Sequence, residues 1–219
     1  DEGDRRSAAG VIPGYSIEGH AIVSRDDRIA GADGVTPLAL RNPADWARFQ
    51  RALDASVAVL LGRHSHLANP DTHRRNRIVV SSAADGIERG ADGWWWNPQK
   101  TSLTEALATA APAGGTIAVP GGRLVFDLFL QRGFDAFHLA RSRDVRIPDG
   151  VPIFSAVSGE RSAESLLQAA GLLAGDTEVL DAAAGVTLTV WRRSLLSHGI
   201  MEIAHMEPRD ILQTIPFFG

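Results

Sequence analysis

The sequence predicts an α/β domain with a mostly parallel central sheet, helices on both faces and an antiparallel C-terminal edge. Short apolar runs recur at residues 57–62, 77–82 and 116–122, which is the pattern of buried parallel strands. Segments long enough for helices separate these runs, as the crossovers between parallel strands require. The last strand-like run, at residues 185–194, alternates apolar and polar residues. Late alternating strands often pair antiparallel at a sheet edge.

The composition is that of one large globular domain. The chain has 219 residues, of which 44% are hydrophobic and 22% charged. A net charge of −4 supplies no general field that attracts a nucleic-acid backbone. No window reaches the roughly 18 apolar residues of a membrane span, and the first residues lack the apolar centre of a signal peptide. The absence of cysteine excludes disulfides and thiolate metal sites. We therefore expect a cytoplasmic protein that binds neither nucleic acid nor membranes.

The first predicted segments are an N-terminal arm, a strand, a loop and a helix. Residues 1–15 mix charge, Gly and Pro before any periodic pattern, which predicts a flexible arm. An apolar strand is predicted at residues 17–23, and the Asp, Gly and Pro residues after it predict a long loop. Asn42 is an N-cap candidate, and Pro43 suits the first position of the helix that follows. The apolar residues of this helix at helical spacing are Trp46, Phe49 and Leu53.

The second half of the chain continues the alternation of helices and strands. Helical patterns occupy residues 101–111 and 123–133, and a strand is predicted at residues 134–142. Residues 146–154 contain Pro and Gly and predict an exposed, turn-rich connection. A short helix is predicted at residues 162–173, before the alternating strand.

No repeat or linker divides the chain. We expect one folded domain at residues 16–194 and a C-terminal extension at residues 195–219. Phe217 and Phe218 are too apolar to be left exposed, so we expect them to pack either on the domain or on a twin subunit. A homodimer is therefore one of two expectations.

Two glycine-bearing strand ends are candidate phosphate sites. Gly62, Arg63, His64 and Ser65 lie where a buried strand passes into a helix, and exposed N–H groups there favour a phosphate. The Gly121–Gly122 pair lies at a second such junction and allows a ligand to approach the backbone closely. Each turn alone is also compatible with a plain strand-to-helix connection. Together, at the carboxyl ends of parallel strands, they predict a dinucleotide or a similar phosphate ligand.

Asp45 has two interpretations. It falls in the first turn of its helix, where a carboxylate stabilises the helix N-terminus. If Trp46 and Phe49 line a cleft, the same carboxylate is instead a partly desolvated anchor with a raised pKa.

Three histidines and a tryptophan run are further candidate sites. His64, His66 and His73 form a possible metal cluster, but no carboxylate lies at a fixed spacing from them, which favours solvated histidines. The WWW run at residues 94–96 has no basic residues interleaved with it, so we expect packing at the sheet edge rather than a base-stacking platform.

Five motifs in order resemble the dihydrofolate reductase-like superfamily. They are AIVSRDDRIAG (21–31), NPADWARF (42–49), VLLGRHS (59–65), RRNRIVVSS (74–82) and VPGGRLVF (119–126). The superfamily includes dihydrofolate reductases and the C-terminal reductase domain of riboflavin biosynthesis. The resemblance implies a three-layer sandwich and an enzyme, a reductase that uses NADPH to transfer a hydride to a small heterocyclic substrate.

The resemblance also implies a role for each site residue. Asp45 is the expected catalytic acid that grips a pterin, and the residues expected to bind substrate are Ile22, Phe49 and Arg75. The residues expected to bind the cofactor NADPH are Ile29, Gly62, Arg63, His64, Ser65, Ser81, Ser82, Gly121, Gly122, Leu124 and Val125.

Several positions depart from the dihydrofolate reductase pattern. The loop lacks the usual Pro-Trp, and Ala140 stands where a Thr is expected. The SRDDRIA run resembles the riboflavin branch instead, although Pro120 stands where that branch often has Glu. The first expectation is therefore reduction of a dihydrofolate-like pterin. The alternatives are reduction of a ribosylaminopyrimidine and a nucleotide-binding protein without catalysis.

Overall fold

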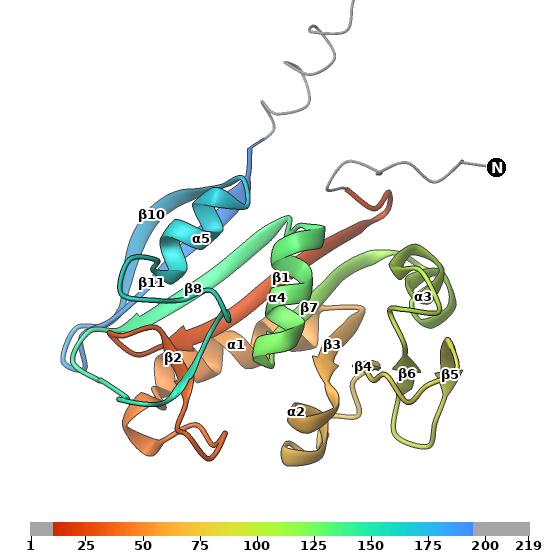
Figure 1. Cartoon of the computed structure of the whole chain (residues 1–219), viewed down its shortest axis with the longest axis horizontal. Helices are drawn as coiled ribbons and strands as arrows, with labels where there is room; N and C mark the ends of the chain where they lie inside the picture. The colour runs from red at the N-terminus through yellow and green to blue at the C-terminus, as the bar shows by residue number, and fades with distance from the viewer. Residues whose placement is uncertain (1–10, 195–219) are drawn as a thin grey trace, which may run out of the picture.

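A computed structural model describes residues 11–194 (Figure 1). Its main sheet has nine strands in the order β10-β11-β8-β1-β7-β3-β4-β6-β5. Their bounds are β1 Tyr15–Val23, β3 Ala58–Gly62, β4 Arg77–Val80, β5 Ile87–Arg89, β6 Trp94–Trp96, β7 Gly115–Gly121, β8 Ala136–Ser142, β10 Leu172–Asp181 and β11 Val186–Arg193. The strands β8, β1, β7, β3, β4 and β6, neighbours in this order, run parallel to one another. Strands β10 and β11 add an antiparallel edge beside β8. The predicted sheet is confirmed.

Helices cover both faces of this sheet. They are α1 Pro43–Ala55, α2 Arg63–Ala68, α3 Leu103–Ala110, α4 Arg123–Arg132 and α5 Ala163–Ala169, with a short 3-10 helix, η1, at Leu38–Leu40. Apolar side chains of α3, α4 and α5 join the larger core on one face, whereas Leu53 and Phe49 of α1 join a smaller core on the other. In Figure 1, α4 and α5 accordingly lie in front of the sheet and α1 behind it.

The start of α1 is fixed by one side chain. Asn42 accepts hydrogen bonds from the backbone N–H groups of Ala44 and Asp45, which otherwise have no partner in the first turn. Its Nδ2 donates to Asp181 Oδ2 of β10 at 2.9 Å. The predicted N-cap therefore also attaches α1 to the antiparallel edge of the sheet.

Several elements differ from the sequence-based prediction. Residues 146–154 are not an exposed connection throughout, because Ile153 and Phe154 are fully buried. This segment forms strand β9, Val151–Pro152, which pairs with β2, Arg28–Ala30, inside the loop predicted after the first strand. Tertiary contact thus converts two apparently irregular segments into a small second sheet.

Three strands of the main sheet were not predicted. The helix expected to reach residue 173 ends at Ala169, and β10 starts three residues later. Strands β5 and β6 each have only three residues, so they carry little periodicity. Trp96 of β6 is fully buried, and β5 rather than the tryptophan run forms the edge.

The folded part begins earlier than expected. Ile12 packs against the core, Tyr15 starts β1, and the Tyr15 hydroxyl donates to the backbone oxygen of Ala111. The predicted arm at residues 1–15 is therefore wrong for its last residues. Residues 1–10 and the extension with Phe217 and Phe218 lie outside the described residues.

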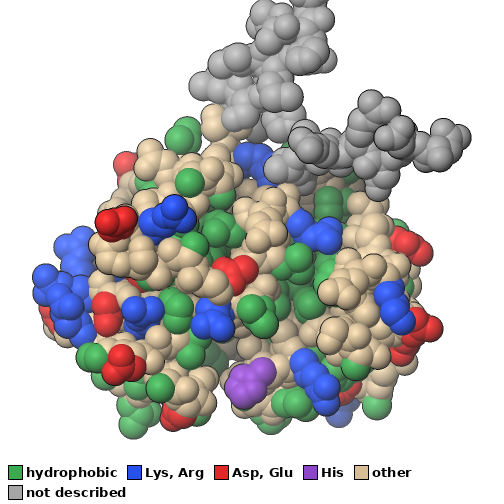
Figure 2. All heavy atoms as spheres, viewed as in Figure 1, with side chains coloured by type: hydrophobic (Ala, Val, Ile, Leu, Met, Phe, Trp, Pro, Cys, Tyr) green, Lys and Arg blue, Asp and Glu red, His purple; other side chains and the backbone are tan. Residues whose placement is uncertain are grey.

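The surface carries both signs of charge. On the face seen in Figure 2, acidic and basic side chains are interspersed. Within residues 11–194, no helix combines the length and apolar character needed to cross a bilayer.

Candidate active site

Helix α1 lies antiparallel to the strand that follows it. It ends at Ala55, and β3 begins three residues later at Ala58. The first turn of α1, with Asp45, therefore lies toward the carboxyl ends of the parallel strands, and its last turn lies toward their amino ends. Ligands of open α/β sheets bind beyond the carboxyl ends of the strands.

The two glycine turns lie together at those carboxyl ends. A β-carbon on Gly62 would stand 3.3 Å from Val125 Cγ2, and one on Gly122 would stand 3.4 Å from Ser65 Oγ. Gly122 has φ +70°, a left-handed conformation that glycine adopts without strain. The first turns of α2 and α4 thus lie side by side, and both present backbone N–H groups to the same region.

The loop after β1 lies against α2. A β-carbon on Gly34 would stand 3.4 Å from His64 Nε2, and the Thr36 hydroxyl donates to the backbone oxygen of Ile29. The side chains of Arg63, His64 and Leu124 are exposed. These residues, all predicted to bind a cofactor, are accessible to a ligand.

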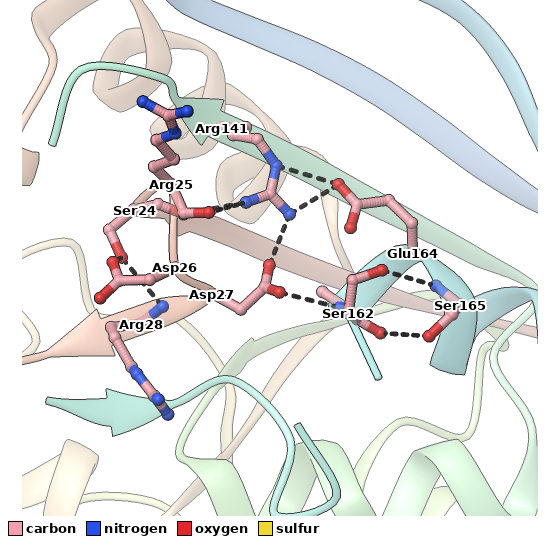
Figure 3. Close-up of polar contacts among 10 residues, drawn as sticks. Ser24, Arg25, Asp26, Asp27, Arg28, Arg141, Ser162, Glu164 and Ser165 are labelled. Carbon is pink, nitrogen blue, oxygen red and sulfur yellow. Dashed lines mark hydrogen bonds and ion pairs between the residues drawn. The ribbon is translucent and has the colours of Figure 1, made fainter. Parts of the chain in front are cut away.

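The loop is held at its base by a polar network around Arg141 of β8 (Figure 3). Arg141 donates to the carboxylates of Asp27 and Glu164 and to the backbone oxygen of Ser24. Asp26 accepts from the Ser24 hydroxyl and from the backbone N–H of Ile147. The network joins the loop to β8, to α5 and to the segment before β9.

The two serines after β4 have different environments. Ser81 is buried, its N–H donates to the backbone oxygen of Trp96, and its Oγ accepts from Ala83 N–H at 3.3 Å. Ser82 is exposed, and its backbone oxygen accepts from Asn97 Nδ2. Ser81 therefore shapes the turn, while the Ser82 side chain faces solvent.

Asp45 is buried on α1. Only 7% of it is exposed, and its Oδ1 accepts from Arg48 Nη2 at 3.2 Å. Burial raises the pKa of this carboxyl, and the neighbouring Arg48 opposes the rise without cancelling it. Asp45 therefore combines a position in the first turn of the helix with desolvation of its carboxyl.

A histidine that was not predicted lies next to Arg48. His20 of β1 is 2% exposed, and neither of its ring nitrogens has a hydrogen-bond partner among the described residues. Burial, together with smaller contributions from the nearby His138 and Arg48, lowers the pKa of His20 to about 3. The Phe49 ring lies 6.3 Å from the His20 ring.

His20 belongs to a cluster on two neighbouring strands. His20 and His138 are register partners on β1 and β8, and their rings stack with centroids 4.4 Å apart. His138 Nε2 lies 3.1 Å from Glu18 Oε2, and this hydrogen bond is the largest cause of a lowered pKa at Glu18. Glu18 and His20 are polar residues two positions apart in a strand with an apolar pattern, and this is the sequence signal that could have indicated the cluster.

A cavity of about 150 Å³ opens beside the cluster. It is lined by Glu18, His20, Ala52, Ala55, Ser56, Thr116 and His138. These residues come from β1, β7, β8 and the end of α1, so the cavity lies toward the amino ends of the strands, away from the glycine turns.

Two predicted substrate residues lie on the α1 side of the sheet. Ile22 is half-buried and lies two residues after His20 on β1, so the two side chains point to the same face of the sheet. Arg75 donates to Asp54 Oδ1 at 2.9 Å and to Gln50 Oε1 at 2.7 Å, both on α1. Arg75 is thus engaged within the fold, near the last turns of α1.

The expectation of solvated histidines is wrong for His66. It is buried, with Nε2 2.7 Å from Asp92 Oδ2 and Nδ1 3.1 Å from Arg77 Nη1. His64 and His73 are exposed. In the described part of the chain, these three histidines form no ligand cluster, whereas Glu18, His20 and His138 do.

Comparison with known proteins identifies the fold. No protein-family model and no curated protein matches the sequence. A solved dihydrofolate reductase from Enterococcus faecalis, complexed with NADP(H) and RAB-propyl, matches with a TM-score of 0.56 and 16% identity. The match covers 82% of this chain and 96% of that one. The chain therefore has the dihydrofolate reductase fold, as the resemblance predicted.

Riboflavin-biosynthesis proteins match equally well. A putative riboflavin biosynthesis protein from Shewanella sp. PV-4 has a TM-score of 0.57 and 18% identity, over 82% of this chain and 99% of that chain. RibD from Acinetobacter baumannii has a TM-score of 0.60 and 16% identity, over 82% of this chain and 58% of that chain. Both branches named in the resemblance thus share this fold.

Proposed function

We propose that the protein is an NADPH-dependent reductase that transfers a hydride to a C=N bond of a pterin resembling dihydrofolate. The observation that carries the proposal is the buried Asp45 carboxyl with its raised pKa, on the helix whose first turn lies toward the glycine turns. A buried carboxyl with a perturbed pKa near a ligand site is typical of a catalytic acid or base.

The glycine turns fit a dinucleotide. Gly62 and Gly122 leave the first N–H groups of α2 and α4 open at neighbouring points, and such groups bind phosphate oxygens. The exposed Arg63 adds a guanidinium that pairs with a phosphate in a bidentate manner. NADPH supplies the hydride when bound, and the structural match that contains NADP(H) supports this choice of cofactor.

Asp45 would hold the substrate. An ionised carboxylate accepts charge-assisted hydrogen bonds from the N–H groups of an amidine-like ring edge. Hydride addition to C=N makes the ring nitrogen basic, so a proton must reach it, directly or through an oriented water. Because burial raises the pKa of Asp45, its carboxyl retains a proton to a higher pH than an exposed aspartate does, which favours its use as a proton donor.

A second candidate substrate is a ribosylaminopyrimidine. The observation that favours it is the Arg141 network, which fixes the base of the SRDDRIA loop by bonds to Asp27 and Ser24. This loop carries the resemblance to the riboflavin branch.

The substrate test is NADPH oxidation with dihydrofolate, dihydrobiopterin and the ribosylaminopyrimidine, followed at 340 nm. Turnover fastest with dihydrofolate supports the proposal, and turnover with the pyrimidine alone selects the second candidate. NADPH binding without turnover on any of the three indicates a nucleotide-binding protein without catalysis.

The cofactor site is tested by Arg63→Ala. Arg63 is exposed, so the variant should fold normally while losing one charged phosphate contact. We expect NADPH to bind about tenfold more weakly or worse, since a hydrogen bond to a charged group contributes about 1.5–3 kcal/mol. Unchanged affinity by calorimetry would contradict the assignment, and Arg161→Ala, at another exposed arginine, is the matched control.

The catalytic role is tested by Asp45→Asn. This change keeps the size and removes the charge, so turnover at neutral pH should fall roughly 10²–10⁴-fold with NADPH affinity nearly unchanged. Asp176→Asn, at an exposed position of β10, serves as the control. Full activity of Asp45→Asn would contradict the catalytic role and leave Asp45 only as a residue of the first turn of α1.

A further inference from the structure

We propose that Glu18, His20 and His138 form a binding site for a divalent transition-metal ion, with zinc as the ion that fits best. This site adjoins Ile22 and Phe49, which are expected to bind substrate, but it shares no residue with the proposed substrate and cofactor sites and does not depend on the proposed reductase activity.

The first argument is the ligand set. Each of the three residues offers one ligand atom, and these atoms all lie within 4.8 Å of one another. Two imidazoles and one carboxylate are the protein ligands of many catalytic zinc sites, in which a fourth position stays open. The ligands of a tetrahedral zinc ion lie about 3.4 Å apart at bond lengths of about 2.1 Å. The ligand atoms would therefore move closer together by up to about 1.4 Å, which rotations within the present rotamer wells of the three side chains allow.

The second argument is the state of His20. This ring is almost fully buried, yet neither nitrogen has a hydrogen-bond partner in the described part of the chain. A buried polar group without a partner destabilises the fold, so a histidine kept for structure alone is normally paired. His66 shows the contrast, since both of its nitrogens have partners. A metal ion would give the lone pair of His20 a partner.

The third argument is the cavity. It adjoins all three ligands, and its wall includes the hydroxyl-bearing Thr116. A metal bound by three residues of the sheet would present its open position to this space, where a water or a small anionic group has room to bind. Hydroxyl groups near a metal-bound water orient it.

The rigidity of the site favours metal binding over chance proximity. His20 and His138 are directly opposite each other on paired strands, and Glu18 precedes His20 by two residues on the same face. The backbone hydrogen bonds of β1 to both β7 and β8 hold these positions. Sites built on strands are held more precisely than sites on loops.

The site is also separate from Asp45. The cavity contacts α1 at Ala52 and Ala55, seven and ten residues beyond Asp45. At about 1.5 Å per helical residue, this corresponds to roughly 10–15 Å along the helix. The metal would therefore lie on the same face as the proposed substrate site but nearer the amino ends of the strands.

The test is metal binding by the full chain. After treatment with a chelator, native mass spectrometry and calorimetry with Zn²⁺ should show one ion per chain. Glu18→Gln, His20→Asn and His138→Asn should each weaken binding at least about 100-fold, more than the 10–100-fold cost of losing an outer-shell partner. The matched control is His64→Asn with His73→Asn, which removes two exposed histidines and should leave binding unchanged.

A second measurement does not depend on how the variants fold. X-ray absorption of the zinc-loaded wild-type chain should show two imidazole ligands and oxygen in the remaining positions. Absence of one-to-one binding, binding that survives all three substitutions, or a spectrum with fewer than two imidazoles would overturn the proposal. Binding that disappears only when His198 and His205 are replaced would place the metal on the C-terminal extension and would also overturn it.

Discussion

At the scale of single residues, burial decides what a side chain can do. Asp45 and Asp54 lie on the same helix, but Asp45 is buried against Arg48 while Asp54 is exposed and paired with Arg75 and His73. The same residue type therefore has a raised pKa at one position and serves as a surface ion-pair partner at the other. Residue type alone does not separate the two roles.

The raised pKa of Asp45 predicts a pH-dependent gain in stability for Asp45→Asn. The folded chain holds the Asp45 proton more tightly than the unfolded chain does, so ionisation costs folding free energy as pH rises above the ordinary aspartate pKa. Asp45→Asn should therefore raise the Tm relative to wild type at pH 7, and the difference should shrink as the pH falls below about 4. Thermal unfolding followed by circular dichroism at both pH values measures this.

The control for that experiment is Asp176→Asn, where the carboxylate is exposed. Its Tm difference should be small at both pH values. A Tm of Asp45→Asn that lies below wild type at pH 7 would mean that the Arg48 pair outweighs desolvation.

At the scale of elements, caps and pairings set where helices begin and how they attach to the sheet. Asn42, Ser102 and Ser162 each cap a helix by accepting a backbone hydrogen bond. Asn42 differs from the other two because its Nδ2 also reaches Asp181 of β10. The orientation of α1, and with it the position of Asp45, depends on both the cap and the bond to Asp181.

Two substitutions at Asn42 separate its cap from its bond to Asp181. Asn42→Ala removes the cap and the bond to Asp181, whereas Asn42→Ser keeps an oxygen for the cap and loses the bond to Asp181 alone. The loss of a cap costs about 0.5–2 kcal/mol, so Asn42→Ala should be less stable than Asn42→Ser by about that amount. Urea unfolding measures both. Equal stabilities of the two variants would show that the cap contributes nothing here.

At the scale of the whole molecule, one arginine connects segments that lie far apart in the chain. Arg141 of β8 bonds to the 24–27 loop and to Glu164 of α5, which are more than 130 residues apart from each other. The Arg141 guanidinium is largely buried, and these anionic partners raise its pKa although burial opposes the rise. The network joins the N-terminal loop to the C-terminal part of the sandwich.

Removing this arginine should destabilise the fold. Arg141→Met leaves the Asp27 carboxylate, only 10% exposed, without its cation, and breaking such a pair costs about 3–5 kcal/mol. The double variant Arg141→Met with Asp27→Asn should recover part of the loss, because the buried position 27 then carries no unpaired charge, and the remaining Glu164 carboxylate is more exposed. Chemical denaturation of both variants and of the exposed-site control Arg143→Met tests this, and a double variant no more stable than Arg141→Met would contradict it.

The sequence by itself determined the elements with strong local signals. The apolar runs of β3, β4 and β7, the helical spacing of α1 with its cap at Asn42, and the glycines at two strand ends were all predicted from neighbouring residues. Such signals are local because side-chain periodicity and helix capping depend on residues that are close together in the sequence. The order of the motifs was also sufficient for the resemblance to a fold that the structural matches confirm.

Only the tertiary structure decided the rest. Strands β2, β5 and β9 have two or three residues and exist because a partner strand completes their hydrogen bonds. His20 and His138 are 118 residues apart, and only the pairing of β1 with β8 brings their rings into contact. Burial of Asp45 likewise depends on α1 packing across the sheet. Contacts between distant segments are set by how complete elements pack, which no local pattern in the sequence contains.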